Sequence, residues 1–327
     1  MTLQMLWEQD EPDGVLRDRF GLADLDAASA WVSGMLERHW GIAVAACDRI
    51  VMSDRNALAW VRSAAGEHLL LKWSVAPERF ARLGSVAALA AWLGTRGLPV
   101  SAPIPARDGR VQVEDDGVSA GLQRVVSGTW LDVGDLRQVR SAGSALARLH
   151  AAMRSWPERA HVEATLGRPA SASSQIAAWI ATDPASLTPR ARTVLQDLLD
   201  AAPPEPDERQ VVHGDFRAAN VLMAGDEVTG VLDLEEIRVD STVGELARSA
   251  VLLGTMFREW APVSTAVHGA LLEGYQTVRG LTEAELAWWR IQVLWYALAL
   301  VPPGDDPHGW GAAADELVAA EARPGTR

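Results

Sequence analysis

The chain has one cysteine and one lysine in 327 residues, and each scarcity narrows what it can be. A single cysteine, Cys47, cannot form an internal disulfide or a cysteine-based metal site, and we expect it to be a small buried hydrophobic residue. No apolar run is long enough to span a bilayer, because even the stretch 293–301 is followed by two prolines. The first residues are acidic and lack the basic and apolar regions of a secretory signal. We therefore expect a cytoplasmic protein that does not bind membranes.

Composition and charge further limit the classes of protein to which the chain can belong. With 48% hydrophobic and 22% charged residues the chain is an ordinary globular sequence, and its length favours two subdomains over one. Its 43 acidic and 30 basic residues give a net charge of −13, which repels the phosphate backbone of nucleic acids. The same charge suits a cationic ligand, although solubility alone also accounts for it.

Lys72 is the only lysine among the 30 basic residues. Arginine serves bidentate and surface roles, whereas a compact ammonium group on a flexible stem suits contact with one point between phosphates. Lys72 lies in the apolar run 68–73, which together with the runs 48–52 and 58–62 predicts three β-strands. A polar loop at 53–56 and a turn at 64–67 join them. The alternative is that Lys72 only protects a strand edge.

The order of the predicted elements indicates an α+β fold with two lobes. Residues 1–125 contain β-prone runs, turns at 108–109 and 116–117, and helical patterns near 26–40 and over 77–93, which predict a small antiparallel sheet with packed helices. Helical segments at 138–153, 174–182 and 188–201 begin a larger, mainly helical lobe, residues 126–327. We expect the connector 124–128 to lie at a cleft between the lobes, where ligands usually bind.

The strongest functional signal is the segment 211–236, in which two short apolar strands flank a polar loop. The loop contains Asp215 and Asn220, and Asp233 follows the second strand. Phosphoryl transfer needs a carboxylate to accept a proton from the attacking hydroxyl and oxygen ligands to hold magnesium against nucleotide phosphates. Asp215, Asn220 and Asp233 supply that set, and Lys72 supplies a cation. These residues predict a phosphotransferase.

Residues 213–220, HGDFRAAN, resemble the catalytic loop of the aminoglycoside phosphotransferase and choline kinase group of small-molecule kinases, relatives of protein kinases. The segment 146–151, LARLHA, resembles the family's helix before that loop, and 245–247, ELA, resembles its Asp-Leu-Ala segment. The likeness extends from about residue 48 to about residue 275. It implies a bilobal protein-kinase-like fold, with a small antiparallel-sheet N-lobe and a larger helical C-lobe.

The resemblance implies a role for each polar residue of the motif. Asp215 corresponds to the catalytic base, and His213 braces the loop around it. Arg217 is placed to neutralise charge on the transferring group. Asn220 and Asp233 correspond to the two Mg²⁺ ligands.

The resemblance also implies ATP or GTP as the phosphoryl donor. Lys72 corresponds to the lysine that contacts the nucleotide phosphates, and Ser53, Asn56, Arg124 and Val126 are further candidates for nucleotide binding. Two features depart from the family pattern. The helix after the lysine strand has no acid near 85–86 to pair with the lysine, and the loop 53–56 has no glycine.

Candidates for binding the phosphate acceptor are acidic and aromatic side chains near Asp233 and in the C-terminal region, which we expect to be helical over 256–322. They are Glu235, Glu236, Trp260, Trp289, Asp305, Asp306 and Trp310. Each also has an ordinary explanation, as a solvated charge, a solvated turn or a packed tryptophan.

The expected function is transfer of the γ-phosphate of ATP to a hydroxyl of a small cationic molecule. An antibiotic, such as an aminoglycoside or a basic peptide antibiotic, is the leading substrate class, and the function is then resistance. The alternatives are a metabolic kinase for homoserine, choline, ethanolamine or an amino sugar, and a catalytically silent relative that binds nucleotide. The sequence contains no signal for the oligomeric state.

Overall fold

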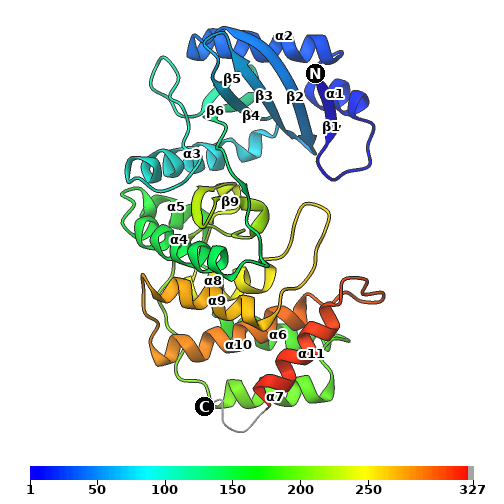
Figure 1. Cartoon of the computed structure of the whole chain (residues 1–327), viewed down its shortest axis with the longest axis vertical. Coiled ribbons are helices and arrows are strands. Elements are labelled where there is room, and N and C mark those ends of the chain that lie inside the picture. The colour runs from blue at the N-terminus through cyan, green and yellow to red at the C-terminus, as the bar shows by residue number, and fades with distance from the viewer. Residues whose placement is uncertain (323–327) are drawn as a thin grey trace. The chain divides into compact units, whose positions relative to one another are not determined.

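A six-stranded sheet organises the first part of the chain in the computed structural model, which describes residues 1–322 (Figure 1). Its strand order is β1-β2-β3-β4-β6-β5, with β1 parallel to β2 and the other neighbours antiparallel. The strands are β1 (Thr2–Met5), β2 (Val44–Ser53), β3 (Asn56–Ser63), β4 (His68–Ser74), β5 (Val113–Asp115) and β6 (Val118–Arg124). The chain divides into two compact units after Ser127.

Helices cover one face of this sheet. They are α1 (Pro12–Phe20) and α2 (Leu25–Met35), with a π-helical turn at Leu36–Trp40. Trp73 of β4 packs against Phe20 of α1 and Trp31 of α2, with ring centroids 6.0 and 5.1 Å apart. Because successive side chains of a strand alternate between faces, Leu71 and Trp73 enter this core and Lys72 points to the opposite face.

Lys72 lies on an interior strand, since β4 pairs with β3 on one side and β6 on the other. Its neighbours across the two ladders are Leu58 and Gly121. The interpretation of Lys72 as a strand-edge residue is therefore excluded. After β4 the chain forms a 3₁₀ turn at Pro77–Arg79 and helix α3 (Phe80–Thr95), which buries Leu89 and Leu93.

The second unit is mainly helical. Its helices are α4 (Leu136–Arg154), α5 (Arg159–Leu166), α6 (Ala172–Ala181), α7 (Pro189–Asp200), α8 (Thr242–Leu252), α9 (Thr265–Gln276), α10 (Glu283–Ala299) and α11 (Trp310–Glu321). Helices α4 and α9 pack backbone to backbone, because Gly143 and Gly274 face each other's helix where a Cβ atom does not fit. Ser144 donates a hydrogen bond to the carbonyl of Gly274 at 2.8 Å across this contact.

Short strands lie beside these helices and carry the candidate catalytic loop. One small sheet pairs β8 (Gln210–Val212) with β11 (Arg238–Asp240), and another has the order β10-β9-β7. The latter strands are β7 (Thr129–Trp130), β9 (Val221–Ala224) and β10 (Glu227–Val231). Two short 3₁₀ turns lie in this region. One, at Ala218–Asn220, follows Arg217, and the other, at Leu234–Glu236, follows Asp233.

The predicted α+β class, with a small antiparallel-rich sheet and a larger helical part, is confirmed. Two expectations need correction. The N-terminal residues form β1 and α1, neither of which was predicted. The region from Met256 to Ser264 is irregular instead of helical, because a bridge between Thr255 and Trp260 closes it into a turn. No helix among residues 1–322 is long and apolar enough to cross a membrane.

Candidate active site

The candidate catalytic loop connects β8 to β9. The residues before and after its polar part, Val211, Val212 and Val221, are fully buried, so both ends of the loop are anchored in the core. Ala218 donates a backbone hydrogen bond to the carbonyl of Leu253 at 3.0 Å, which ties the middle of the loop to the end of α8. The sequence thus places a short polar segment on a rigid support, as chemistry requires.

The Asp215 carboxylate is held in one orientation by two neighbours. The Asn220 side-chain amide donates to Asp215 Oδ2 at 3.0 Å and to the Asp215 carbonyl at 2.8 Å. Arg217 Nε donates to the same Oδ2 atom at 2.9 Å. Two charge-assisted hydrogen bonds on one oxygen keep the carboxylate fixed. The structure therefore brings together three residues that the sequence assigned to catalysis and metal binding.

His213 braces the loop from inside. Its side chain is fully buried and contacts the edge of the Phe216 ring, with centroids 5.9 Å apart. The backbone N–H of Asp215 donates to His213 Nδ1 at 3.2 Å, and Nε2 donates to the carbonyl of Leu232 at 2.9 Å. The ring thus connects the catalytic loop to the strand end that precedes Asp233.

Gly214 is required by a close approach of two backbones. Its φ angle is +86°, and a Cβ atom there would collide with the carbonyl of Glu236. Its own carbonyl accepts hydrogen bonds from Arg238 at 2.9 Å and Arg248 at 2.6 Å. Only glycine fits this site without displacing the segment after Asp233.

The buried carboxylate of Glu245, in α8, holds the backbone N–H groups of His213 and Gly214. It accepts hydrogen bonds from the backbone N–H groups of His213, at 3.0 Å, and Gly214. His150 of α4 donates to it from Nε2 at 2.7 Å, and the other ring nitrogen lies 2.9 Å from the Tyr275 hydroxyl of α9. The sequence motifs include His150 and Glu245, but no pattern in the sequence indicates that these two side chains meet here.

The charge state of Glu245 follows from these partners. Burial raises the pKa of this carboxyl group, but the hydrogen bond from His150 and the electrostatic interactions with His150, His213 and Arg238 outweigh that effect and lower the pKa to about 2. Glu245 is therefore an ionised carboxylate with 1% of its surface exposed. Its partners compensate the desolvation of its charge.

Asp233 follows a residue that is hydrogen-bonded to Asn220. Leu232 donates a hydrogen bond to the carbonyl of Asn220 at 2.8 Å, so the residue before Asp233 is joined directly to the catalytic loop. Asp233 has left-handed φ and ψ angles of 60° and 65°, which are unusual outside glycine, and it is exposed. Backbone strain of this kind gathers at functional sites.

The donor set fits a Mg²⁺ ion that is shared with phosphates. The amide nitrogen of Asn220 is used in holding Asp215, so its amide oxygen is the atom able to bind a metal. Among residues 1–322, no group of three or more His, Cys, Asp or Glu side chains could hold a metal by itself. Mg²⁺ commonly takes one or two protein carboxylates and completes its shell with water and phosphate oxygens.

In the first unit, the turn between β2 and β3 is tighter than a phosphate-binding loop of several residues. Ser53 and Asn56 pair across it, leaving only Asp54 and Arg55 in the turn. The N–H of Asp54 donates to the carboxylate of Glu8 at 2.8 Å, so one turn amide already holds an anionic group.

The helix after Lys72 has no acidic residue over its whole length. Glu78, the nearest acid before it, lies 3.6 Å from Arg55 in an exposed ion pair. In the connector, Arg124 is exposed and pairs with Glu67 at 3.1 Å, whereas Val126 is half-buried. The roles of Arg124 and Val126 in nucleotide binding stay predictions.

The acceptor candidates have different surroundings. Asp306 caps α11, because its carboxylate accepts from the N–H groups of Gly309, Trp310 and Gly311 at 2.7–3.0 Å. Trp310 is buried and donates from Nε1 to the carbonyl of Trp260 at 2.9 Å. Asp306 and Trp310 thus make contacts within the protein that stabilise its structure.

The other acceptor candidates lie as follows. Trp260 is exposed, and its ring faces Arg217, whose guanidinium carbon lies 5.6 Å from the ring centroid. Trp289 of α10 is half-buried, and Asp305 is exposed. Beside Asp233, Glu236 is exposed and Glu235 is half-buried. Trp260 is thus the candidate that the structure joins to Asp215, through Arg217.

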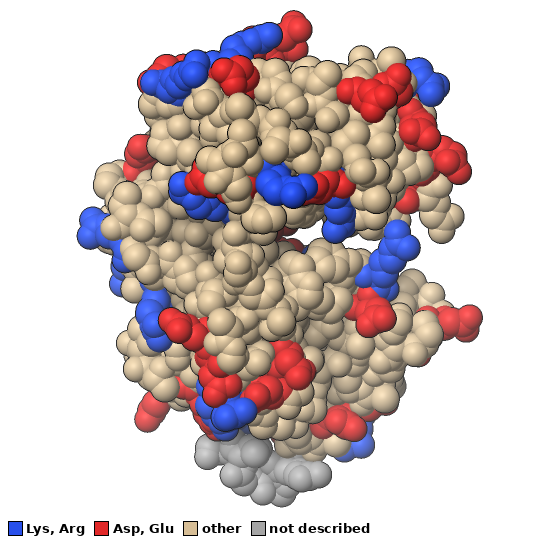
Figure 2. Space-filling view, turned by 45° about the horizontal axis from the view of Figure 1, so that its top comes forward, with Lys and Arg blue, Asp and Glu red and all other residues tan. Residues whose placement is uncertain are grey.

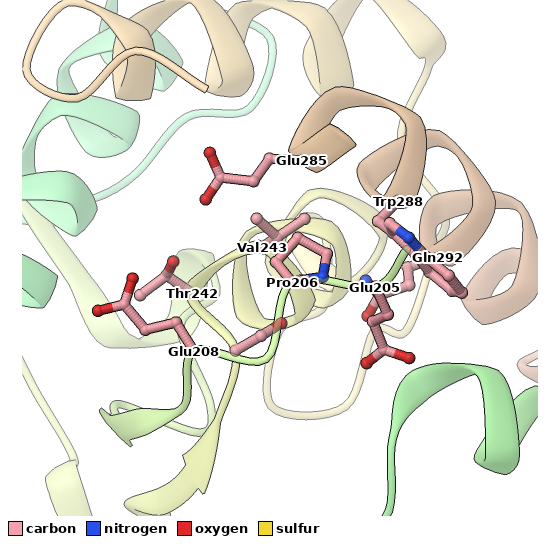
Figure 3. Close-up of a pocket in the computed structure, with 9 residues that line it drawn as sticks. Glu205, Pro206, Glu208, Thr242, Val243, Glu285, Trp288 and Gln292 are labelled. Carbon is pink, nitrogen blue, oxygen red and sulfur yellow. The ribbon is translucent and has the colours of Figure 1, made fainter. Parts of the chain in front are cut away.

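A small pocket in the second unit lies among paired glutamates (Figure 3). It has a volume of about 40 Å³ and contains none of the predicted catalytic residues. Glu205 and Glu285 on its wall pair with Arg209 and Arg279. Glu205 and Glu285 are therefore members of structural ion pairs. On the surface seen in Figure 2, acidic and basic side chains are interspersed.

Comparison with known proteins identifies the family of the chain. The sequence profile described as "Phosphotransferase enzyme family" matches residues 51–291, which contain Lys72, Asp215, Asn220 and Asp233. The chain belongs to this family. The resemblance to a phosphotransferase family, seen in residues 213–220, is thereby confirmed.

Curated relatives of this phosphotransferase family member are named homoserine kinases. The protein of Rhizobium rhizogenes is 30% identical over 196 residues, covering 60% of either chain. The protein of Methylorubrum populi is 31% identical over 200 residues, again covering 60% of each. The chain thus matches about three fifths of the length of these relatives.

Solved structures with a similar fold are antibiotic phosphotransferases. Macrolide 2'-phosphotransferase MphH from Brachybacterium faecium is 19% identical, has a TM-score of 0.54, and the match covers 91% of this chain and 99% of that one. Aminoglycoside phosphotransferase APH(4)-Ia, solved with ADP and hygromycin B, is 15% identical with a TM-score of 0.55, covering 90% and 99%. At these identities the likeness establishes the fold.

Proposed function

We propose that this protein transfers the γ-phosphate of ATP or GTP to a hydroxyl group of a small molecule. The observation that carries the proposal is the Asp215 carboxylate, held at one oxygen by Arg217 and Asn220 while Asp233 lies one residue from a backbone bond to Asn220. Family membership supports it, as do the curated kinases and phosphotransferases that the chain resembles.

Each residue has a separate task in this mechanism. Asp215 orients the acceptor hydroxyl and takes its proton as the oxygen attacks the γ-phosphorus, whose bond to the bridging oxygen breaks and releases ADP or GDP. Arg217, already hydrogen-bonded to Asp215, offers positive charge to the transferring group. Asn220 and Asp233 would hold Mg²⁺, which would supply neutralisation of phosphate charge. Lys72 contacts the nucleotide phosphates.

The identity of the acceptor is a separate proposal. The structural relatives act on antibiotics, the curated relatives are named homoserine kinases, and the chain carries a net charge of −13, which favours a cationic acceptor. We favour an antibiotic-like acceptor because the second unit exposes large aromatic side chains, one of which, Trp260, lies against Arg217. A silent nucleotide-binding relative is disfavoured, because Lys72, Asp215, Asn220 and Asp233 are all retained.

Replacing Asp233 by asparagine tests the metal site. Asparagine tolerates left-handed backbone angles, so the change removes the charge without adding strain. We expect the Mg²⁺ concentration for half-maximal activity to rise by roughly tenfold to a hundredfold, the scale known for perturbed metal sites. The matched control is Asp183→Asn, another aspartate of the second unit with positive φ, which should leave the Mg²⁺ titration unchanged. An unchanged titration for Asp233→Asn would remove Asp233 from the metal site.

Replacing Lys72 by arginine tests the phosphate contact. If Lys72 were a general surface charge, a chain with so many arginines should accept the change. We expect kcat/KM for ATP to fall by about tenfold or more, the loss of roughly one hydrogen bond to a charged group. Arg62→Lys on the neighbouring strand is the control, because Arg62 forms an exposed pair with Asp48 at 3.4 Å. Full activity of Lys72→Arg contradicts the assignment.

A further inference from the structure

Three large aromatic side chains of the second unit are exposed near the catalytic loop. Trp130 of β7, Phe257 and Trp260 expose 42%, 40% and 45% of their surfaces. Exposed aromatic rings that lie together commonly mark a binding surface. We define these three residues as the aromatic cluster.

The cluster is built on a turn that is tied to the catalytic loop. A bridge between Thr255 and Trp260 and a hydrogen bond of 2.7 Å from Met256 N to the Glu259 carbonyl close this turn. Arg217 Nη1 donates to the carbonyl of Thr255 at 3.5 Å. The turn backbone is thus fixed, while the rings at its tip stay exposed.

The cluster continues directly from the catalytic carboxylate. Arg217 donates to Asp215 at 2.9 Å and stacks its guanidinium group over the Trp260 ring at 5.6 Å. Phe257, on the same turn, packs against Trp130 with ring centroids 5.4 Å apart and planes at 72°. A molecule whose hydroxyl lies at Asp215 can therefore extend over Trp260 toward Phe257 and Trp130.

We propose that the aromatic cluster binds the phosphate acceptor and selects one whose hydroxyl is carried on a ring-bearing skeleton with an apolar face. This inference rests on the proposed phosphotransferase function and assigns its substrate class. A four-carbon amino acid such as homoserine has no ring and no broad apolar face to bury against Phe257 and Trp130. An edge-to-face ring pair offers a broad apolar surface, which a ring or macrocycle buries more completely than a short charged chain.

The test compares acceptors and variants at saturating ATP and Mg²⁺. The acceptors are homoserine, spectinomycin, hygromycin B and a macrolide, and the variants are Phe257→Ala, Phe257→Leu, Trp130→Ala and Trp130→Phe. Val278→Ala, which removes another exposed apolar side chain of this unit, is the control and should leave all rates unchanged. Thermal unfolding of each variant shows that it folds.

We expect at least one ring-bearing acceptor to have a kcat/KM about tenfold or more above that of homoserine. Phe257→Ala and Trp130→Ala should raise KM for that acceptor by about tenfold with a smaller change in kcat, whereas the Leu and Phe replacements retain most of the binding. The inference is overturned if homoserine is the best acceptor or if the alanine variants leave KM for the ring-bearing acceptors unchanged. Absence of transfer to every acceptor by the wild-type protein contradicts the phosphotransferase proposal itself, whereas transfer that persists undiminished in Asp215→Asn removes only the role of Asp215.

Discussion

Replacing Asp215 by asparagine is expected to lower kcat for phosphoryl transfer by about 10³-fold while KM for the nucleotide stays nearly constant. The carboxamide has the size of the carboxylate, but it cannot accept the proton of the attacking hydroxyl. It also loses the charge that holds Arg217 at 2.9 Å. Steady-state kinetics with a coupled assay for ADP measures both constants.

A second aspartate controls for charge alone. Asp226, in the turn between β9 and β10, lies 3.4 Å from Arg137 in an exposed pair. Asp226→Asn should therefore retain full activity, because exposed pairs contribute little. Equal kcat values for the wild type and Asp215→Asn would show that Asp215 is not the base.

Replacing Glu245 by alanine is expected to destabilise the protein by about 3–5 kcal/mol, the range seen when one partner of a buried charged pair is removed. The N–H groups of His213 and Gly214 would lose their acceptor, and His150 would lose its partner. Because these peptides precede Asp215, activity should fall with stability. Urea unfolding followed by circular dichroism gives the free energy of unfolding.

Two further variants distinguish the loss of the buried Glu245 carboxylate from the loss of a surface charge. Glu273→Ala removes the exposed partner of Arg140, and we expect a loss of less than about 1 kcal/mol. Glu245→Gln keeps the volume of the side chain and removes its charge. A free energy of unfolding within the range of Glu273→Ala would show that the Glu245 contacts contribute little.

The same residue predicts a dependence of stability on pH. The pKa of Glu245 is lowered from 4.5 to about 2 on folding, so the unfolded chain binds this proton more readily. The stabilisation, about 3 kcal/mol for such a shift, is present above pH 4.5 and is lost as the pH falls toward 2. Glu245→Gln should lack this component of the acid transition. A variant with the wild-type pH profile contradicts the assignment.

The parts of the structure that follow local patterns could be predicted from sequence. The apolar run around Lys72 and its flanking turns predicted the β3–β4 pair, because the strand signal and the turn signal lie within a few residues. The loop between β8 and β9 followed from two valine-rich ends around a polar segment. The roles of Asp215, Asn220 and Asp233 came from the resemblance to a family that the chain is now shown to join.

The features that were missed depend on contacts between distant residues. Strand β1 exists because Thr2–Met5 pairs with residues near Arg49, and no local pattern marks that pairing. Glu245 belongs to α8 and accepts a hydrogen bond from Gly214 of the loop between β8 and β9, so the motif at 245–247 alone did not indicate this contact. The contact between Trp130 and Phe257 joins two segments of little regular structure, and neither ring has a periodicity that identifies it.

The most direct test of the account is ³¹P NMR of a reaction containing the protein, Mg²⁺, ATP and a hydroxyl acceptor. The account predicts a phosphomonoester signal that grows with the wild-type protein at the rate of ADP formation and is absent over the same period with Asp215→Asn. Inorganic phosphate as the sole product with every acceptor, or phosphomonoester formed equally fast by Asp215→Asn, would contradict it.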